Sequence, residues 1–63
     1  MCEARAYLIE KGEPRLIMEN VDRIEPEGEG LRLVNIFGEQ KFLKARIRAV
    51  ALMENKVLLD PAA

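Results

Sequence analysis

The stretch CEARAYL, Cys2 to Leu8, alternates strictly between two kinds of side chain. The small and apolar residues on one face of an extended chain are Cys2, Ala4, Ala6 and Leu8. The residues on the other face are Glu3, Arg5 and Tyr7. A period of two is typical of a half-buried strand. The chain is therefore expected to begin with a strand, and its only cysteine lies at the start of that strand.

Turn signals divide the following residues into further short strands. EKGEP, residues 10–14, indicates a turn, and RLIM, residues 15–18, is the expected return strand of a first hairpin. Residues 19–30 suit a helical turn or a bulged strand. We favour the strand because Pro26 disfavours helix at the residue before it. EGEG, residues 27–30, predicts a tight turn leading into a second hairpin strand, LRLVNIF, residues 31–37.

The last third of the chain also favours strands. Residues 42–53 alternate but exceed the usual strand length, so we expect a break or bend near residues 49–51. Helix-forming residues compete there, but the alternation favours a strand. VLLD, residues 57–60, is the expected last strand, and Asp60-Pro61 its end. Five or six short strands predict an all-β fold, a small SH3-like barrel or meander, with residues 1–60 as one domain and residues 61–63 as a tail.

Size and charge limit the classes of function. A chain of 63 residues is near the lower limit for a self-supporting core, and one cysteine excludes an internal disulfide, so a metal or a partner subunit is expected. Ten basic residues against eleven acidic ones provide no broad basic field for nucleic acid. No apolar run is long enough to cross a membrane and no signal peptide is evident, which indicates a cytoplasmic protein.

Catalysis and RNA binding are not favoured by the side chains present. Histidine, serine and threonine are absent, so the hydrolase arrangements with a histidine base cannot be built. The carboxylates Glu25, Glu27 and Glu29 are expected to form a solvated turn. A basic stripe is possible at Lys41, Lys44, Arg46 and Arg48, but with only three aromatic residues it is better explained as a solvated strand face.

Cys2 is the strongest candidate for chemistry. Its thiolate lies one chelate ring from its own amide and two from the terminal amine, and removal of Met1 would put amine and thiolate in one five-membered ring. Such nitrogen and sulfur donors in a plane favour nickel or copper. Met1 could add a thioether as a weaker ligand. The alternative is that Cys2 is only a small packed hydrophobe.

The ligand count predicts a homodimer. One subunit supplies one thiolate and one or two nitrogens, so the remaining donors must come from solvent, from a carboxylate such as Glu3, or from a second Cys2. Two copies related by a twofold axis give a closed site, and twofold dimers are the commonest homo-oligomers. The small side chains of Ala4 and Ala6 are expected to let the two first strands approach closely.

The sequence resembles the CooT family. The resemblance rests on the initial Met-Cys, the VDRIEPEG core at residues 21–28 and the IFGE turn at residues 36–39, and it extends from Met1 to about Leu59. It implies a small homodimeric SH3-like protein that binds nickel through the cysteine after the initiator methionine, here Cys2. It also implies an association with the maturation of the nickel-containing carbon monoxide dehydrogenase.

The choice of metal and the alternatives depend on this resemblance. The ligand types alone do not separate nickel from copper, and the preference for nickel comes from the family. We therefore predict a non-catalytic nickel carrier or sensor whose partners are a second copy and a nickel enzyme or its maturation factors. The alternatives are an SH3-like module that binds RNA or protein, with Cys2 purely structural, and a plain oligomeric scaffold.

Overall fold

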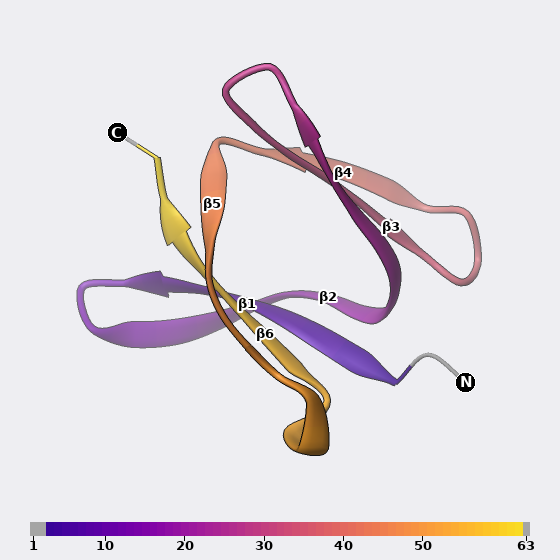
Figure 1. The fold of residues 1–63 in the computed structure, drawn as a ribbon, viewed down its shortest axis with the longest axis horizontal. Coiled ribbons are helices and arrows are strands. Elements are labelled where there is room, and N and C mark those ends of the chain that lie inside the picture. Colours follow the sequence, from indigo (N-terminus) through magenta and orange to yellow (C-terminus); the bar gives the residue numbers. More distant parts are fainter. Residues whose placement is uncertain (1–2, 63) are drawn as a thin grey trace.

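The fold is a single curled sheet of six strands, described for residues 3–62 by a computed structural model (Figure 1). The strands are β1 (Ala4–Glu10), β2 (Glu13–Glu27), β3 (Gly30–Asn35), β4 (Gln40–Leu43), β5 (Ala45–Ala51) and β6 (Lys56–Pro61). One short 3-10 helix, η1 (Leu52–Glu54), joins β5 to β6. The all-β prediction of five to six strands is confirmed. Within residues 3–62 no helix is long and apolar enough to cross a membrane.

The strands are ordered β4-β3-β2-β1-β6-β5, so the first and last strands of the chain lie side by side. β1 and β6 pair in parallel, and all other neighbours are antiparallel. The sheet curls around one apolar core, formed by Ala6, Leu8, Met18, Val21, Leu31, Leu33, Ala45, Val57 and Leu59. Curling lets a single sheet bury one face, because β5 at one end of the sheet comes close to β3, the strand next to the other end.

The first hairpin forms where the sequence predicts it. Lys11 and Gly12 make the two-residue turn with positive φ angles of 54° and 79°, which suits the right-handed twist of the flanking strands. Pro14 pairs with Ile9 across the hairpin. The expected inward face of β1 is also correct at Ala6 and Leu8, which are buried.

β2 differs from the expected division into two short strands. It is one continuous strand of 15 residues, confirming strand over helix for residues 19–27. Register shifts interrupt its pairing with β1 and with β3 near residues 16–23, and Asn20 there has a positive φ of 56°. Such bulges bend a strand, and the bent β2 serves both halves of the sheet (Figure 1).

A glycine closes one corner of the barrel. Gly30 begins β3 directly against the end of β4, where a Cβ atom would lie 2.1 Å from the backbone oxygen of Leu43. Only a residue without a side chain fits so close to backbone. The corner is completed by a bend at Lys44, after which the chain enters β5.

The expected break near residues 49–51 is found where β5 ends at Ala51 and η1 begins, but the chain also breaks earlier, between β4 and β5. The chain bends at Lys44, and β5 then continues to Ala51 with a register shift between Ile47 and Ala49. The reason is that β4 and β5 lie at opposite ends of the sheet, so the chain turns at the barrel corner rather than in mid-strand. β6 reaches Pro61, and the amide of Ala62 donates a hydrogen bond to the oxygen of Lys44 at 2.9 Å.

Candidate metal centre

The predicted ligands Met1 and Cys2 lie outside the described residues. Glu3 is exposed and precedes β1, whose first residue, Ala4, pairs with Val21 of β2. On the other side, the amide of Arg5 donates to the oxygen of Asn55 at 2.9 Å. The start of β1 is therefore held between β2 and the η1–β6 connection, and this fixes where residue 3 leaves the sheet.

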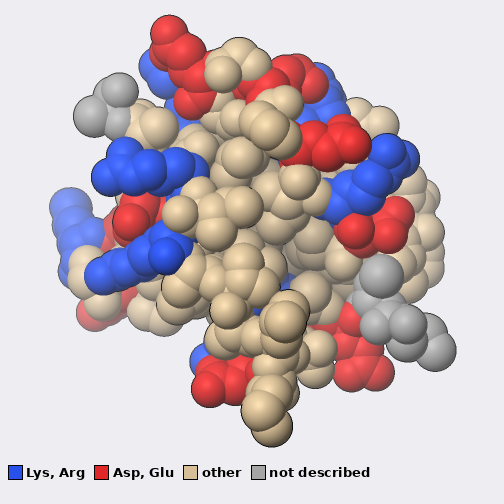
Figure 2. All heavy atoms as spheres, in the orientation of Figure 1, with Lys and Arg blue, Asp and Glu red and all other residues tan. Residues whose placement is uncertain are grey.

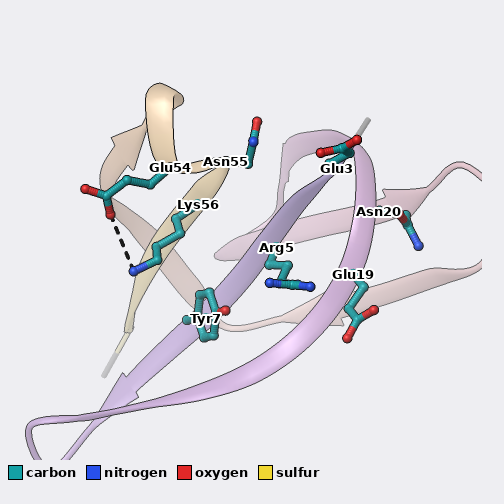
Figure 3. Close-up of a pocket in the computed structure, with 8 residues that line it drawn as sticks. All are labelled: Glu3, Arg5, Tyr7, Glu19, Asn20, Glu54, Asn55 and Lys56. Carbon is teal, nitrogen blue, oxygen red and sulfur yellow. Dashed lines mark ion pairs between the residues drawn. The ribbon is translucent and has the colours of Figure 1, made fainter. Parts of the chain in front are cut away.

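A polar hollow of about 250 Å³ lies beside the start of β1 (Figure 3). Three segments line it, and its residues are Glu3, Arg5, Tyr7, Glu19, Asn20, Glu54, Asn55 and Lys56. Asn20 and Asn55 both have positive φ angles, 56° and 54°. Asparagine tolerates this conformation better than most residues, and the two asparagines turn the backbone at the sides of the hollow.

The charges in the hollow are only partly paired. Lys56 Nζ lies 3.4 Å from Glu54 Oε1, whereas no side-chain hydrogen bond or ion pair joins Arg5, Glu3 or Glu19 to another residue of the 3–62 segment. Carboxylates supply oxygen ligands, so Glu3 and Glu19 offer oxygen donors in the hollow beside the start of β1. Within the same segment no three His, Cys, Asp or Glu side chains group in a way that could hold a metal.

The expected role of Ala4 and Ala6 needs correction. Ala6 is fully buried in the core of its own subunit, and Ala4 packs against that core. Both residues face inward because the period of two continues through β1. They are therefore not available to let a second copy approach, and the face of β1 that a second copy can reach carries Arg5 and Tyr7 instead.

The IFGE turn is organised by Asn35, which the sequence reading did not single out. Asn35 is buried, and its Oδ1 accepts hydrogen bonds from the amides of Phe37 and Glu39 at 3.0 and 2.9 Å. Its Nδ2 donates to Glu39 Oε1 at 2.7 Å. The available signal was an asparagine just before a glycine-containing turn, a position where its side chain often replaces backbone partners.

This turn also connects to the hollow. The amide of Ile36 donates to the oxygen of Asn20 at 2.9 Å, and Asn20 lines the hollow. The IFGE turn is thus hydrogen-bonded to the bulged part of β2 beside the start of β1. The turn leaves Phe37 73% exposed, so its function is not to fill the core.

The acidic turn at residues 25–29 is a set of ion pairs at the surface. Glu25 lies near Arg23, Glu29 near Lys44, and Glu27 forms a bidentate pair with Arg32. The hydrogen bonds from Arg32 lower the pKa of Glu27, and the same pair raises the pKa of Arg32. Both groups stay charged and paired, as expected for a solvated turn rather than for a catalytic pair of carboxylates.

The possible basic stripe is divided by the fold. Lys44 pairs with Glu29 and Arg48 with Asp60, while Lys41 Nζ donates to the oxygen of Ile17 at 3.2 Å. Figure 2 shows basic side chains interleaved with acidic ones around an uncharged middle. This distribution agrees with the prediction of a solvated strand face and does not favour a phosphate backbone as ligand.

Comparisons with known proteins agree with this architecture. Residues 1–60 match the family model for the CO dehydrogenase accessory protein CooT. A crystal structure of a protein assigned as CooT from Carboxydothermus hydrogenoformans is 40% identical, with a TM-score of 0.88 over 95% of this chain and 97% of the other. An uncharacterized protein from Methanocaldococcus jannaschii is 32% identical over 95% of this chain and 98% of its own. The family match includes the Met-Cys start. This chain belongs to the CooT family of CO dehydrogenase accessory proteins.

Proposed function

We propose that this protein is a cytoplasmic nickel carrier or sensor in which residues 1–60 form one domain and two copies share one nickel ion through Cys2. The observation that carries the proposal is the family match, which begins at residue 1 and therefore includes Cys2. CO dehydrogenase is a nickel enzyme, so nickel is the metal that an accessory protein of this family would handle. The protein would deliver or report nickel without catalysing a reaction.

The ligand set proposed for nickel is built around the thiolate. Each copy contributes the Cys2 sulfur together with the backbone amide or the terminal amine, and two copies complete a four-coordinate site of two sulfurs and two nitrogens. Glu3 follows directly and is exposed, so its carboxylate is available as an oxygen donor. Met1 is a further candidate through its thioether when it is retained. The partners are a second copy and a nickel enzyme or its maturation factors.

The proposed site predicts a dependence on pH. A thiol and an amine must lose protons to bind a metal, and their reference pKa values are about 8.5 and about 7.7 to 8. The affinity for nickel should therefore increase from mildly acidic to mildly basic pH. An affinity that stays constant across that range would contradict a thiolate and amine site.

A nickel titration of the parent and of Cys2→Ser tests the proposal. The parent should develop a thiolate-to-nickel charge-transfer band that saturates at one ion per two chains, and native mass spectrometry should show two chains with one nickel. Cys2→Ser should lose the band while keeping its fold, and Cys2→Ala controls for the serine oxygen. Equal nickel binding by the parent and both variants would overturn the proposal.

A further inference from the structure

The outward face of the sheet carries an apolar row across four strands. Tyr7 of β1 pairs directly with Leu16 of β2 and with Leu58 of β6, and Leu58 pairs with Ala49 of β5. Directly paired residues project to the same side of a sheet. This side is opposite to the core, because the neighbours of Tyr7 and Leu58 in sequence are buried. The four side chains therefore form a continuous row, with Leu16 43% exposed at one end.

The row is bordered by a shallow apolar hollow. This hollow has a volume of about 280 Å³ and is lined by Tyr7, Ile9, Pro14, Lys56 and Leu58. The solvated face of an antiparallel sheet usually carries polar residues. A contiguous apolar area on such a face is typical of an interaction surface.

Opposite charges lie on opposite sides of this face near the start of β1. Lys56 is on β6, Arg5 pairs with it on β1, and Glu19 is on β2 (Figure 3). Arg5 and Glu19 form no ion pair within residues 3–62. Arg5 and Lys56 thus lie toward β6, with Glu54 Oε1 3.4 Å from Lys56 Nζ, and Glu19 lies toward β2. The apolar row is next to these charges.

This pattern is complementary to itself under a twofold rotation. An axis parallel to β1, lying between two such faces, places the β2 side of each copy over the β6 side of the other. The β2 end of each apolar row then meets the β6 and β5 end of the other. Near the start of β1, where the charged side chains lie, Glu19 of each copy meets Lys56 of the second copy. Twofold interfaces require such self-complementary surfaces.

The same axis brings the starts of the two β1 strands together. Stacked sheets lie about 10 Å apart, and an axis parallel to β1 makes both β1 strands run in the same direction, so both start at the same end. A twofold axis in the same plane but perpendicular to β1 at Tyr7 would instead separate the two Ala4 residues by about 20 Å along the strands, at about 3.3 Å per residue. Of these two axes, the parallel one suits a metal shared by two Cys2 residues.

We propose that the outward face of β2, β1, β6 and β5 is the surface through which two copies of this chain associate, with Glu19 of each copy facing Lys56 of the other. This inference rests on the homodimer in the proposed function and adds the surface that forms it. Leu16, Tyr7, Leu58 and Ala49 supply the apolar contact. The pairing of Glu19 with Lys56 fixes the relative orientation of the two copies.

Charge reversal in separate chains tests the arrangement. Glu19→Lys and Lys56→Glu each create two like-charge contacts per homodimer, which costs interface affinity. Each variant alone should dimerise at least tenfold more weakly than the parent, with and without nickel. An equimolar mixture should restore the parental affinity, because in the heterodimer both contacts again join opposite charges. Native mass spectrometry of isotope-labelled chains should show heterodimers well above the statistical half.

A matched control uses the ion pair of the barrel corner. Glu29 and Lys44 lie 3.6 Å apart within one chain, and their side chains are 83% and 57% exposed. Glu29→Lys and Lys44→Glu therefore make the same charge changes away from the proposed interface. These two variants should dimerise like the parent, and their mixture should give heterodimers at the statistical share.

The outcomes separate this inference from the proposed function. Parental dimerisation by Glu19→Lys and Lys56→Glu, or a mixture without heterodimer preference, would overturn the interface even if one nickel still binds per two chains. A parent that stays monomeric with and without nickel would also overturn it. Conversely, selective heterodimers together with nickel binding unaffected by Cys2→Ser would keep the interface and reject the metal site. Leu16→Lys should weaken the dimer without unfolding the monomer.

Discussion

The barrel corner and the start of β1 differ in how many of their charged side chains have partners within one chain. At the corner, Gly30 packs against the backbone of Leu43, and the charged side chains of the β2–β3 turn have partners nearby. At the start of β1, Arg5 and Glu19 line a hollow without an ion pair within residues 3–62. The contacts at the corner therefore stabilise the fold. At the start of β1, the charges of Arg5 and Glu19 are available to a second molecule.

The largest effect should come from filling the corner. Gly30→Ala places a Cβ 2.1 Å from the oxygen of Leu43. Since the Leu43 oxygen belongs to the backbone and cannot swing away, the strands must separate, and such overpacking costs about 1 to 3 kcal/mol. Urea unfolding followed by circular dichroism, at one fixed protein concentration, measures the loss in free energy of unfolding.

Gly28→Asn is the matched control for that substitution. Gly28 has a positive φ of 58° and open space around its Cβ position, and asparagine tolerates this conformation. Its loss should stay below about 1 kcal/mol, which is the cost of an ordinary turn substitution. Equal losses of stability for the two glycines would show that the close approach at Gly30 does not account for the effect of Gly30→Ala.

The next effect should come from the turn that connects the two regions. Asn35→Ala leaves the amides of Phe37 and Glu39 without the side-chain oxygen that accepts from them, at a cost of about 1 to 3 kcal/mol. Asn35→Asp keeps that oxygen but places a carboxylate beside Glu39, so its stability should lie between those of Asn35→Ala and the parent at neutral pH. An Asp variant no better than Ala would reject the acceptor role of Asn35.

Substitutions at the start of β1 should separate stability from association. Arg5→Gln and Glu19→Gln remove exposed charges that have no ion pair within residues 3–62, so monomer stability should change by no more than about 0.5 kcal/mol. The dissociation constant of the dimer, measured by analytical ultracentrifugation, should increase for Glu19→Gln. A clear loss of monomer stability would contradict the contrast between the two regions.

The smallest effect concerns pH at the corner. The pKa of Glu27 is lowered by its hydrogen bonds with Arg32, so the pair stabilises the fold above the unfolded-state pKa of Glu27 and is lost as the pH falls through its folded-state pKa. The stability difference between the parent and Glu27→Gln should therefore shrink with acidification below about pH 4.5. High salt should reduce this stability difference at neutral pH, because both side chains are partly exposed to solvent.

Much of the fold was predictable because it depends on local patterns. The alternation in β1 and the glycine turns at residues 11–12 and 28–29 act through periodicity and positive φ, which neighbouring residues decide. The length of β2 and the bend at Lys44 were not predictable in this way. β2 stays continuous because it pairs with β1 along its first half and with β3 along its second, and no local pattern records those partners.

The site was predictable in part for a similar reason. The proposal of Cys2 as a ligand comes from the sequence, because a thiol, an amide and an amine within two residues depend only on covalent distance. Asn35 was missed, since its importance comes from being buried at a turn that contacts Asn20. The proposed interface was missed as well, because Ala6 was expected to face a second copy and instead faces its own core.

The sequence by itself determined the all-β class, the turns, the family and the candidate thiolate, because each depends on residues close together in the chain. Only the tertiary structure decided which face of β1 is buried by its own subunit and which stays open. It also brought Lys56 beside Arg5 through the parallel pairing of the first and last strands. That pairing joins residues about fifty positions apart, and the long-range packing of the core selects it rather than any local preference of the chain.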